Sequence, residues 1–188
     1  FLSLLALLTV LTAGNTMATP AITLSTPSIA ASNVNQGTSN VVVYAVKMKV
    51  ATTAVSVNSI QFTLSGNFDA NDINSAYIYY NASAPVVSGA SFLNSVTATF
   101  EAPHSFSVSI NRSLAVGEQG YFIIVANLSN TATDNHYIQL NGKTNPVVFG
   151  YSVSSSVTNN QANNAGKQTI QASDIILNTP VVNASNVK

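Results

Sequence analysis

The chain has 188 residues, of which 6% are charged, and its six basic and six acidic side chains leave a formal net charge of +0. Because globular proteins carry roughly 25% charged residues, this composition offers neither a basic patch for nucleic acid nor a polybasic stretch for a membrane surface. The chain contains no cysteine, which excludes a disulfide framework and thiolate metal sites. A neutral surface rich in Ser, Thr and Asn lacks like-charge repulsion, so the composition favours self-association.

The first element in chain order is an apolar, uncharged segment at residues 1–14. As a helix it would be about 21 Å long, which is shorter than the ~30 Å hydrocarbon core of a bilayer, so no stable membrane span is expected. Two interpretations stay open: a signal-peptide remnant that ends before Thr19, or a retained segment through which subunits assemble as a helix or a donor strand. In the second case the large apolar side chains form the assembly interface: Phe1, Leu2, Leu4, Leu5, Leu7, Leu8, Val10 and Leu11.

After residue 18, short runs rich in Val, Ile, Tyr, Phe and Thr alternate with clusters of Asn, Ser, Gly and Asp. This pattern is typical of β-strands separated by turns. We therefore predict an all-β Ig-like or Greek-key sandwich over residues 19–188, preceded by the apolar segment of residues 1–18. The expected strands are residues 21–25, 41–50, 55–64, 76–80, 96–100, 106–110, 121–128, 137–140, 147–153 and 174–177.

The strand expected at residues 41–50 has one wet side. Its alternate residues from Val42 through Tyr44 to Val50 should share the buried face, because side chains alternate across a strand. Lys47 and Lys49 then lie on the opposite face.

Two further segments carry specific predictions. In residues 55–64 the apolar parity switches between Val57 and Ile60, which predicts a β-bulge near Asn58 and Ser59. Residues 158–167 are poor in apolar side chains, which predicts a long exposed loop.

Three tyrosines lie on the strand expected at residues 76–80. Tyr77 and Tyr79 should share one face, and Tyr80 should point to the other. Aromatic rings on such a strand either stack on sugars or pack against protein, and packing is the commoner use.

Few side chains could carry chemistry. His104 stands beside a proline and His136 in an Asn/Asp turn, and both are interpreted as loop side chains. Asp69, Asp72 and the neighbouring asparagines could ligate calcium, but the run lacks the Gly hinge and distal Glu of a helix–loop–helix site. A turn capped by its own side chains is therefore favoured. The sequence holds no catalytic, metal or cofactor motif, so we expect neither enzymatic activity nor a cofactor.

The chain contains four Asn-X-Ser/Thr sequons, whose asparagines are candidate sites for covalent glycans. Asn81 is the best placed of them, because its surroundings predict an exposed turn. The four candidates are Asn81, Asn111, Asn127 and Asn183.

Three stretches resemble Ig-like sandwich modules of large secreted surface proteins from Bacteroidota-type bacteria: NVNQGTSNVVVY at residues 33–44, SIQFTLSGNFDANDI at 59–73 and LAVGEQGYFIIVA at 114–126. The resemblance implies an extracellular adhesive or structural module. The N-terminus is also similar to the start of type IV pilins, in which Phe1 would precede an apolar helix, although Leu5 stands where bacterial pilins carry Glu. That second likeness implies only a retained apolar segment with a β-rich head.

Two hypotheses of function follow. The first is an extracellular pilus-like filament subunit, whose partners are identical subunits and whose role is attachment or biofilm formation. The alternative is a monomeric secreted carbohydrate-binding or adhesion module in which residues 1–18 are a signal-peptide remnant. The N-terminus of the mature protein distinguishes the two, because Phe1 favours the filament and Thr19 favours the module.

Overall fold

The computed structural model describes residues 18–163 and 165–172, and the regular elements of this part of the chain are β-strands. In chain order they are β1 (Ala21–Ser25), β2 (Ser32–Asn35), β3 (Val41–Ala51), β4 (Val55–Gly66), β5 (Ile73–Asn81), β6 (Ser91–Val96), β7 (His104–Leu114), β8 (Gln119–Leu128), β9 (Tyr137–Leu140), β10 (Val148–Tyr151), β11 (Ser156–Asn160) and β12 (Gln168–Gln171). None of the described residues belongs to a helix long and apolar enough to cross a membrane.

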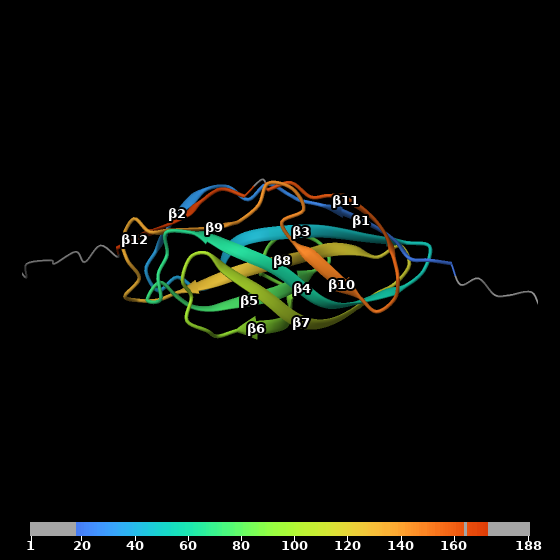
Figure 1. The fold of residues 1–188 in the computed structure, drawn as a ribbon, viewed down its shortest axis with the longest axis horizontal. Helices are drawn as coiled ribbons and strands as arrows, with labels where there is room; N and C mark the ends of the chain where they lie inside the picture. Colours follow the sequence, from blue (N-terminus) through green and yellow to red (C-terminus); the bar gives the residue numbers. More distant parts are fainter. Residues whose placement is uncertain (1–17, 164, 173–188) are drawn as a thin grey trace, which may run out of the picture.

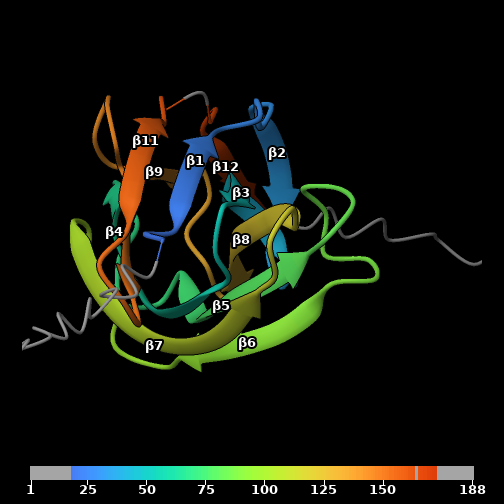
Figure 2. The ribbon, with the colours of Figure 1, turned by 90° about the vertical axis from the view of Figure 1, so that its right-hand side faces the viewer.

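The strands form two mixed sheets packed as a sandwich (Figure 1). The first sheet has the order β11-β1-β3-β8-β5-β6, and the second has the order β10-β4-β9-β12-β2 with β7 also paired to β4. The pairs β1 with β11 and β2 with β12 are parallel, and the others are antiparallel. Figure 2 shows β6 and β7 along one side of the sandwich, opposite the side that holds β1, β2, β11 and β12. The predicted all-β sandwich is confirmed.

The core lies between the sheets because the long strands alternate. Alternate residues of β4, such as Ile60, Phe62 and Leu64, are at most 4% exposed, whereas Gln61 between them is exposed. Phe122 of β8 packs on Tyr80 of the neighbouring β5 with ring centroids 5.3 Å apart. Burial of such aliphatic and aromatic side chains, at about 1.5–3 kcal/mol each, is the main stabilising contribution.

The bulge expected in β4 is confirmed, because the ladder to β7 shifts register between Val57 and Ser59. The ladder from β3 to β8 shifts as well, between Val42 and Tyr44. This second bulge places Val43 in the core and Val42 on the outer face, so the predicted burial of Val42 with Tyr44 is wrong. Two consecutive core residues, Val43 and Tyr44, are the result of the inserted residue.

Some strand boundaries differ from those predicted. The strand expected at residues 96–100 is wrong, because β6 covers Ser91–Val96 and Phe100 reaches the core from the loop that follows. The loop expected at residues 158–167 is also wrong in part. It begins inside β11, and Gln161 is 4% exposed and donates to the carbonyl of Val147 at 2.8 Å. The strand expected at residues 174–177 lies outside the described residues.

The polar strands β2, β11 and β12 were not expected. β11 is exposed at every position, and it forms through parallel pairing with β1. Nonlocal backbone pairing of this kind satisfies N–H and C=O groups without an apolar side chain. The sequence of these segments therefore lacks the alternation from which strands are predicted.

Candidate functional site

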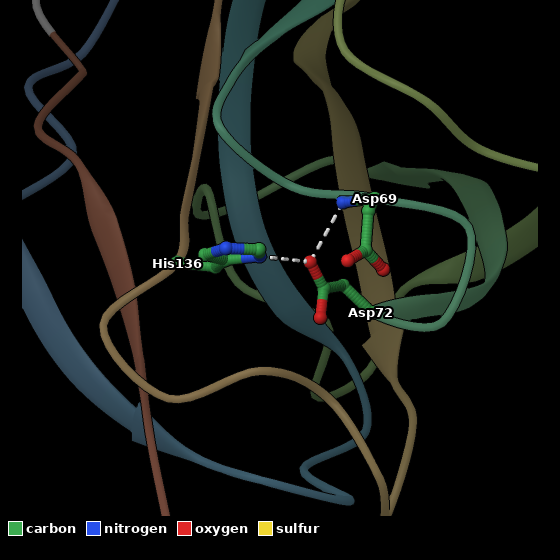
Figure 3. A group of neighbouring side chains, drawn as sticks. All are labelled: Asp69, Asp72 and His136. Carbon is green, nitrogen blue, oxygen red and sulfur yellow. Dashed lines mark hydrogen bonds and ion pairs between the residues drawn. The ribbon is translucent and has the colours of Figure 1, made fainter.

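One cluster of ionisable side chains lies where two loops meet (Figure 3). Asp69 and Asp72 are in the loop between β4 and β5, and His136 immediately precedes β9. Oδ2 of Asp72 accepts from the backbone N–H of Asp69 and from Nδ1 of His136, each at 2.7 Å. Oδ1 of Asp72 accepts from the N–H of Thr133 at 2.6 Å. Asp72 is fully buried, so one carboxylate joins the two loops.

The electrostatics of Asp72 match this structural role. Burial raises the pKa of its carboxyl, but the hydrogen bonds from Thr133, His136 and Asp69 outweigh burial and leave the pKa below its ordinary value. Asp69 in turn accepts from the N–H of Asn71 at 2.8 Å. The turn is thus capped by its own side chains, as favoured from the sequence.

The cluster offers three metal-ligating groups within 4.8 Å of one another, one each from Asp69, Asp72 and His136. Nδ1 of His136 and both oxygens of Asp72 are already engaged in hydrogen bonds. The hydrogen bonds to Asp72 join the loop between β4 and β5 to the segment before β9 through direct contacts. The arrangement therefore acts as a structural latch.

Of the two histidines, His136 is a loop side chain as predicted, whereas His104 lies at the start of a strand. His136 lies before β9, as expected, but it bonds Asp72, a residue 64 positions away. His104 begins β7, and its ring lies 5.4 Å from that of Phe100 and 4.6 Å from that of Phe106. It is a packing residue at the edge of the core.

The outer face of the first sheet carries a second apolar cluster, separate from the core. Ala45 of β3 and Ile123 and Val125 of β8 are fully buried there. Partly buried side chains cover them: Ile29, Val42, Tyr77, Tyr79, Val87 and Tyr121. A solvated sheet face is normally polar, so this face differs from the pattern of an isolated sandwich.

Three aromatic rings lie together on this face, and we call Tyr77, Tyr79 and Phe92 the aromatic patch. Phe92 of β6 is 57% exposed. Its ring centroid lies 5.9 Å from that of Tyr77 and 5.8 Å from that of Tyr79. Tyr80 points into the core instead, so the predicted division of the tyrosines between two faces is confirmed.

The three rings of the aromatic patch pack against one another at steep angles. Tyr77 is at 90° to Tyr79 and at 86° to Phe92. These rings contact one another edge to face, an arrangement that aromatic pairs favour. The rings of the aromatic patch are thus packed on one another, which is the commoner use of such side chains.

The best-placed sequon is not an exposed one. Asn81 is 7% exposed, and its Nδ2 donates to the carbonyls of Val86 at 2.8 Å and Ser88 at 3.1 Å. Its Oδ1 accepts from the N–H groups of Ser83 and Ala84. The expectation of an exposed Asn81 is wrong, because this side chain holds together the loop between β5 and β6.

The asparagines of the other three sequons differ in exposure, and one of them lies outside the described residues. Asn127 is half-buried, and its Oδ1 accepts from the N–H of Asn40 at 2.7 Å. Asn111 on β7 is exposed. Asn183 and the assembly residues of segment 1–14 lie outside the described residues: Phe1, Leu2, Leu4, Leu5, Leu7, Leu8, Val10 and Leu11.

The role of Asn81 gives a testable prediction. Asn81→Ala should lower the free energy of unfolding by about 1–2 kcal/mol, because two carbonyls and two N–H groups of the loop lose their hydrogen bonds to this buried side chain. Ser83→Ala is the matched control. It removes the same sequon but keeps the backbone N–H that donates a hydrogen bond to Oδ1 of Asn81. Urea unfolding of both variants measures the difference, and equal stability of Asn81→Ala and Ser83→Ala would contradict the structural role.

Comparison with known proteins supplies no family. No family model matches the chain, and no curated protein matches it. One solved structure with a similar chain is the complex of a CaDoc0917 variant with CaCohA2, crystallised at pH 5.5. The match has a TM-score of 0.33 and 13% sequence identity, and it covers 80% of this chain and 100% of that chain. A likeness this low leaves the function to be inferred from the chain's own residues.

Proposed function

We propose that the chain is a non-catalytic extracellular interaction module that acts through contacts with other protein chains. The observation that carries the proposal is the aromatic patch, in which Phe92 is 57% exposed above an apolar cluster on an outer sheet face. Exposed aromatic side chains that lie together on a folded domain mark interaction surfaces. The scarcity of charge, 6% of all residues, favours contacts made by packing over contacts made by salt bridges.

Support for a non-catalytic role comes from what the ionisable groups do. Asp72 and His136 bond each other inside the latch. Glu118 pairs with Arg112 at 2.6 Å and also accepts from the hydroxyl of Tyr80 and the N–H of Ala115. The hydrogen bonds of these side chains hold loops and turns in place, which is a structural role.

The finer proposal is a subunit of a pilus-like filament that serves attachment or biofilm formation. In this function residues 1–14, which are apolar and uncharged, dock on a neighbouring subunit and polymerise the chain. A segment that donates to a different surface on the next copy makes a heterologous contact, and such contacts build open helical polymers. Identical subunits are then the partners, and Asn111 is the exposed described sequon at which a covalent glycan would sit.

Two changes to residues 1–14 test the filament proposal: their deletion, and the introduction of a charged side chain among them. The full chain should form fibres, whereas a chain lacking residues 1–14 should stay monomeric in sedimentation and negative-stain images. Leu7→Asp should behave like the deletion, because a buried unpaired carboxylate costs several kcal/mol. Leu7→Met is the matched control that keeps the position apolar. Fibres of normal length from the shortened chain would contradict the role of the segment.

A further inference from the structure

The aromatic patch differs in chemistry from the charged part of its own sheet. Lys47 and Lys49 of β3 point to the same outer side, and Nζ of Lys47 lies 5.8 Å from the ring centroid of Tyr121. Lys47 pairs in register with Tyr121, and Lys49 pairs with Gln119, so both charges lie toward the C-terminal end of β3. Tyr77 and Tyr79 pair with Val125 and Ile123 on β8, nearer the N-terminal end of β3 than either lysine. The aromatic patch itself is therefore uncharged, and the two lysines lie beside it.

Residues 1–14 match this surface in chemistry. The segment has no charged side chain, and large apolar side chains from Phe1 to Leu11 make up most of it. An uncharged apolar surface binds such a segment without removing any charge from water, whereas a charged partner would have to be desolvated. The segment is the one long uncharged apolar run that the sequence holds outside the described strands.

The described chain begins at one end of the sandwich, away from the patch. The carbonyl of Ala18 accepts from Oγ1 of Thr53 at 2.7 Å, and the carbonyl of Thr19 accepts from Oγ1 of Thr52 at 2.8 Å. Both contacts lie at the turn after β3, at the end of the sandwich. Ala45, in the apolar cluster beneath the patch, lies on β3 about 20 Å before that end.

The segment and the patch are different parts of one chain. Ala18 lies at the end of the sandwich, whereas the patch lies on its side. A neighbouring copy that places its segment on the patch makes a contact that repeats from subunit to subunit.

We propose that the aromatic patch is the acceptor for residues 1–14 of a neighbouring subunit, which pack against Tyr77, Tyr79 and Phe92. This inference rests on the proposed filament function and adds the surface at which each subunit receives the next. Phe92 is the central anchor, because it is the most exposed ring and contacts both tyrosines.

Photocrosslinking in the full chain tests the acceptor directly. Phe92 is replaced by p-benzoylphenylalanine, and the unlabelled variant is assembled with the isotope-labelled unsubstituted chain before illumination. We expect adducts between position 92 and residues 1–14 of the labelled chain, identified by mass spectrometry. The same photoprobe at Val148 is the matched control, because Val148 has the same 57% exposure but lies on β10 in the other sheet.

The outcomes separate the acceptor from the filament function. Fibres without adducts to residues 1–14 would show that the aromatic patch is not the acceptor, while the filament proposal would still hold. Adducts within a single molecule would overturn the acceptor as an intersubunit site. A full chain that forms no fibres would overturn the filament proposal and the acceptor together.

A second variant keeps the inference testable without the photoprobe. Phe92→Ser should slow fibre elongation about tenfold or more, as expected of a hot-spot residue. Its melting temperature should stay close to that of the unsubstituted chain, because the side chain is largely exposed. Val148→Ser should change elongation by less than about twofold, since replacing a side chain outside an interface alters binding little. Equal elongation rates for the two variants would overturn the acceptor.

Discussion

Asp72→Asn should lower the free energy of unfolding by about 3–4 kcal/mol at pH 7. The amide keeps one acceptor oxygen, but its NH₂ group then faces an N–H donor where the carboxylate oxygen stood. Thr133, Asp69 and His136 all donate to this carboxylate, so at least one buried donor loses its partner. Asp69→Asn is the matched control in the same turn, because its bond to the N–H of Asn71 is local and exposed and can be kept by the amide oxygen.

The effect of Asp72→Asn should depend on pH in a defined direction. The folded-state pKa of Asp72 lies below the ordinary value of about 3.9, so its carboxylate stabilises the fold fully above that value. The stabilisation is lost as pH falls through the folded-state pKa. Urea unfolding should therefore show a gap between the unsubstituted chain and Asp72→Asn that is widest above about pH 5 and narrows toward pH 2. Glu118 has a lowered pKa in both proteins and so leaves the gap unchanged. A gap of constant size across this range would refute the role of the ionised carboxylate.

Gly120→Ala should destabilise the sandwich by about 2–3 kcal/mol, as overpacking of a core does. Gly120 lies in β8, and a Cβ there would overlap Cζ and the hydroxyl of Tyr80 on β5. Moving the ring aside would break two contacts, because its hydroxyl donates to Glu118 at 2.9 Å and the guanidinium of Arg112 lies 4.1 Å from its centroid. In a strand without such a neighbour, alanine would be better than glycine, so the predicted sign is the opposite of the intrinsic preference.

A double-mutant cycle identifies the cause. In a Tyr80→Leu background the far end of the ring is absent, so adding Gly120→Ala should cost little further stability. Chemical unfolding of the two single variants and the double variant measures the coupling. Additive losses would mean that the contact with Tyr80 is not what keeps residue 120 a glycine.

The sequence by itself determined the long strands of the sandwich. Residues 55–64 and 121–128 carry apolar alternation or continuous apolar runs, and they became β4 and β8 with nearly the predicted bounds. The parity switch between Val57 and Ile60 located the bulge in β4. These features are local, because the side-chain period of a strand and a break in that period are both written within a few residues.

The tertiary structure decided what depends on distant partners. β11 is polar and exposed and exists through its ladder with β1, and Val42 faces outward because of a bulge opposite β8. Asp72 meets His136 across 64 positions, and Phe92 meets Tyr77 and Tyr79 through the pairing of β5 with β6. Single-sequence patterns record the preference of each residue for a buried or exposed face, but they do not record which strands become neighbours. Strand order fixes the latch and the aromatic patch, and it is set by the packing energy of the whole sandwich.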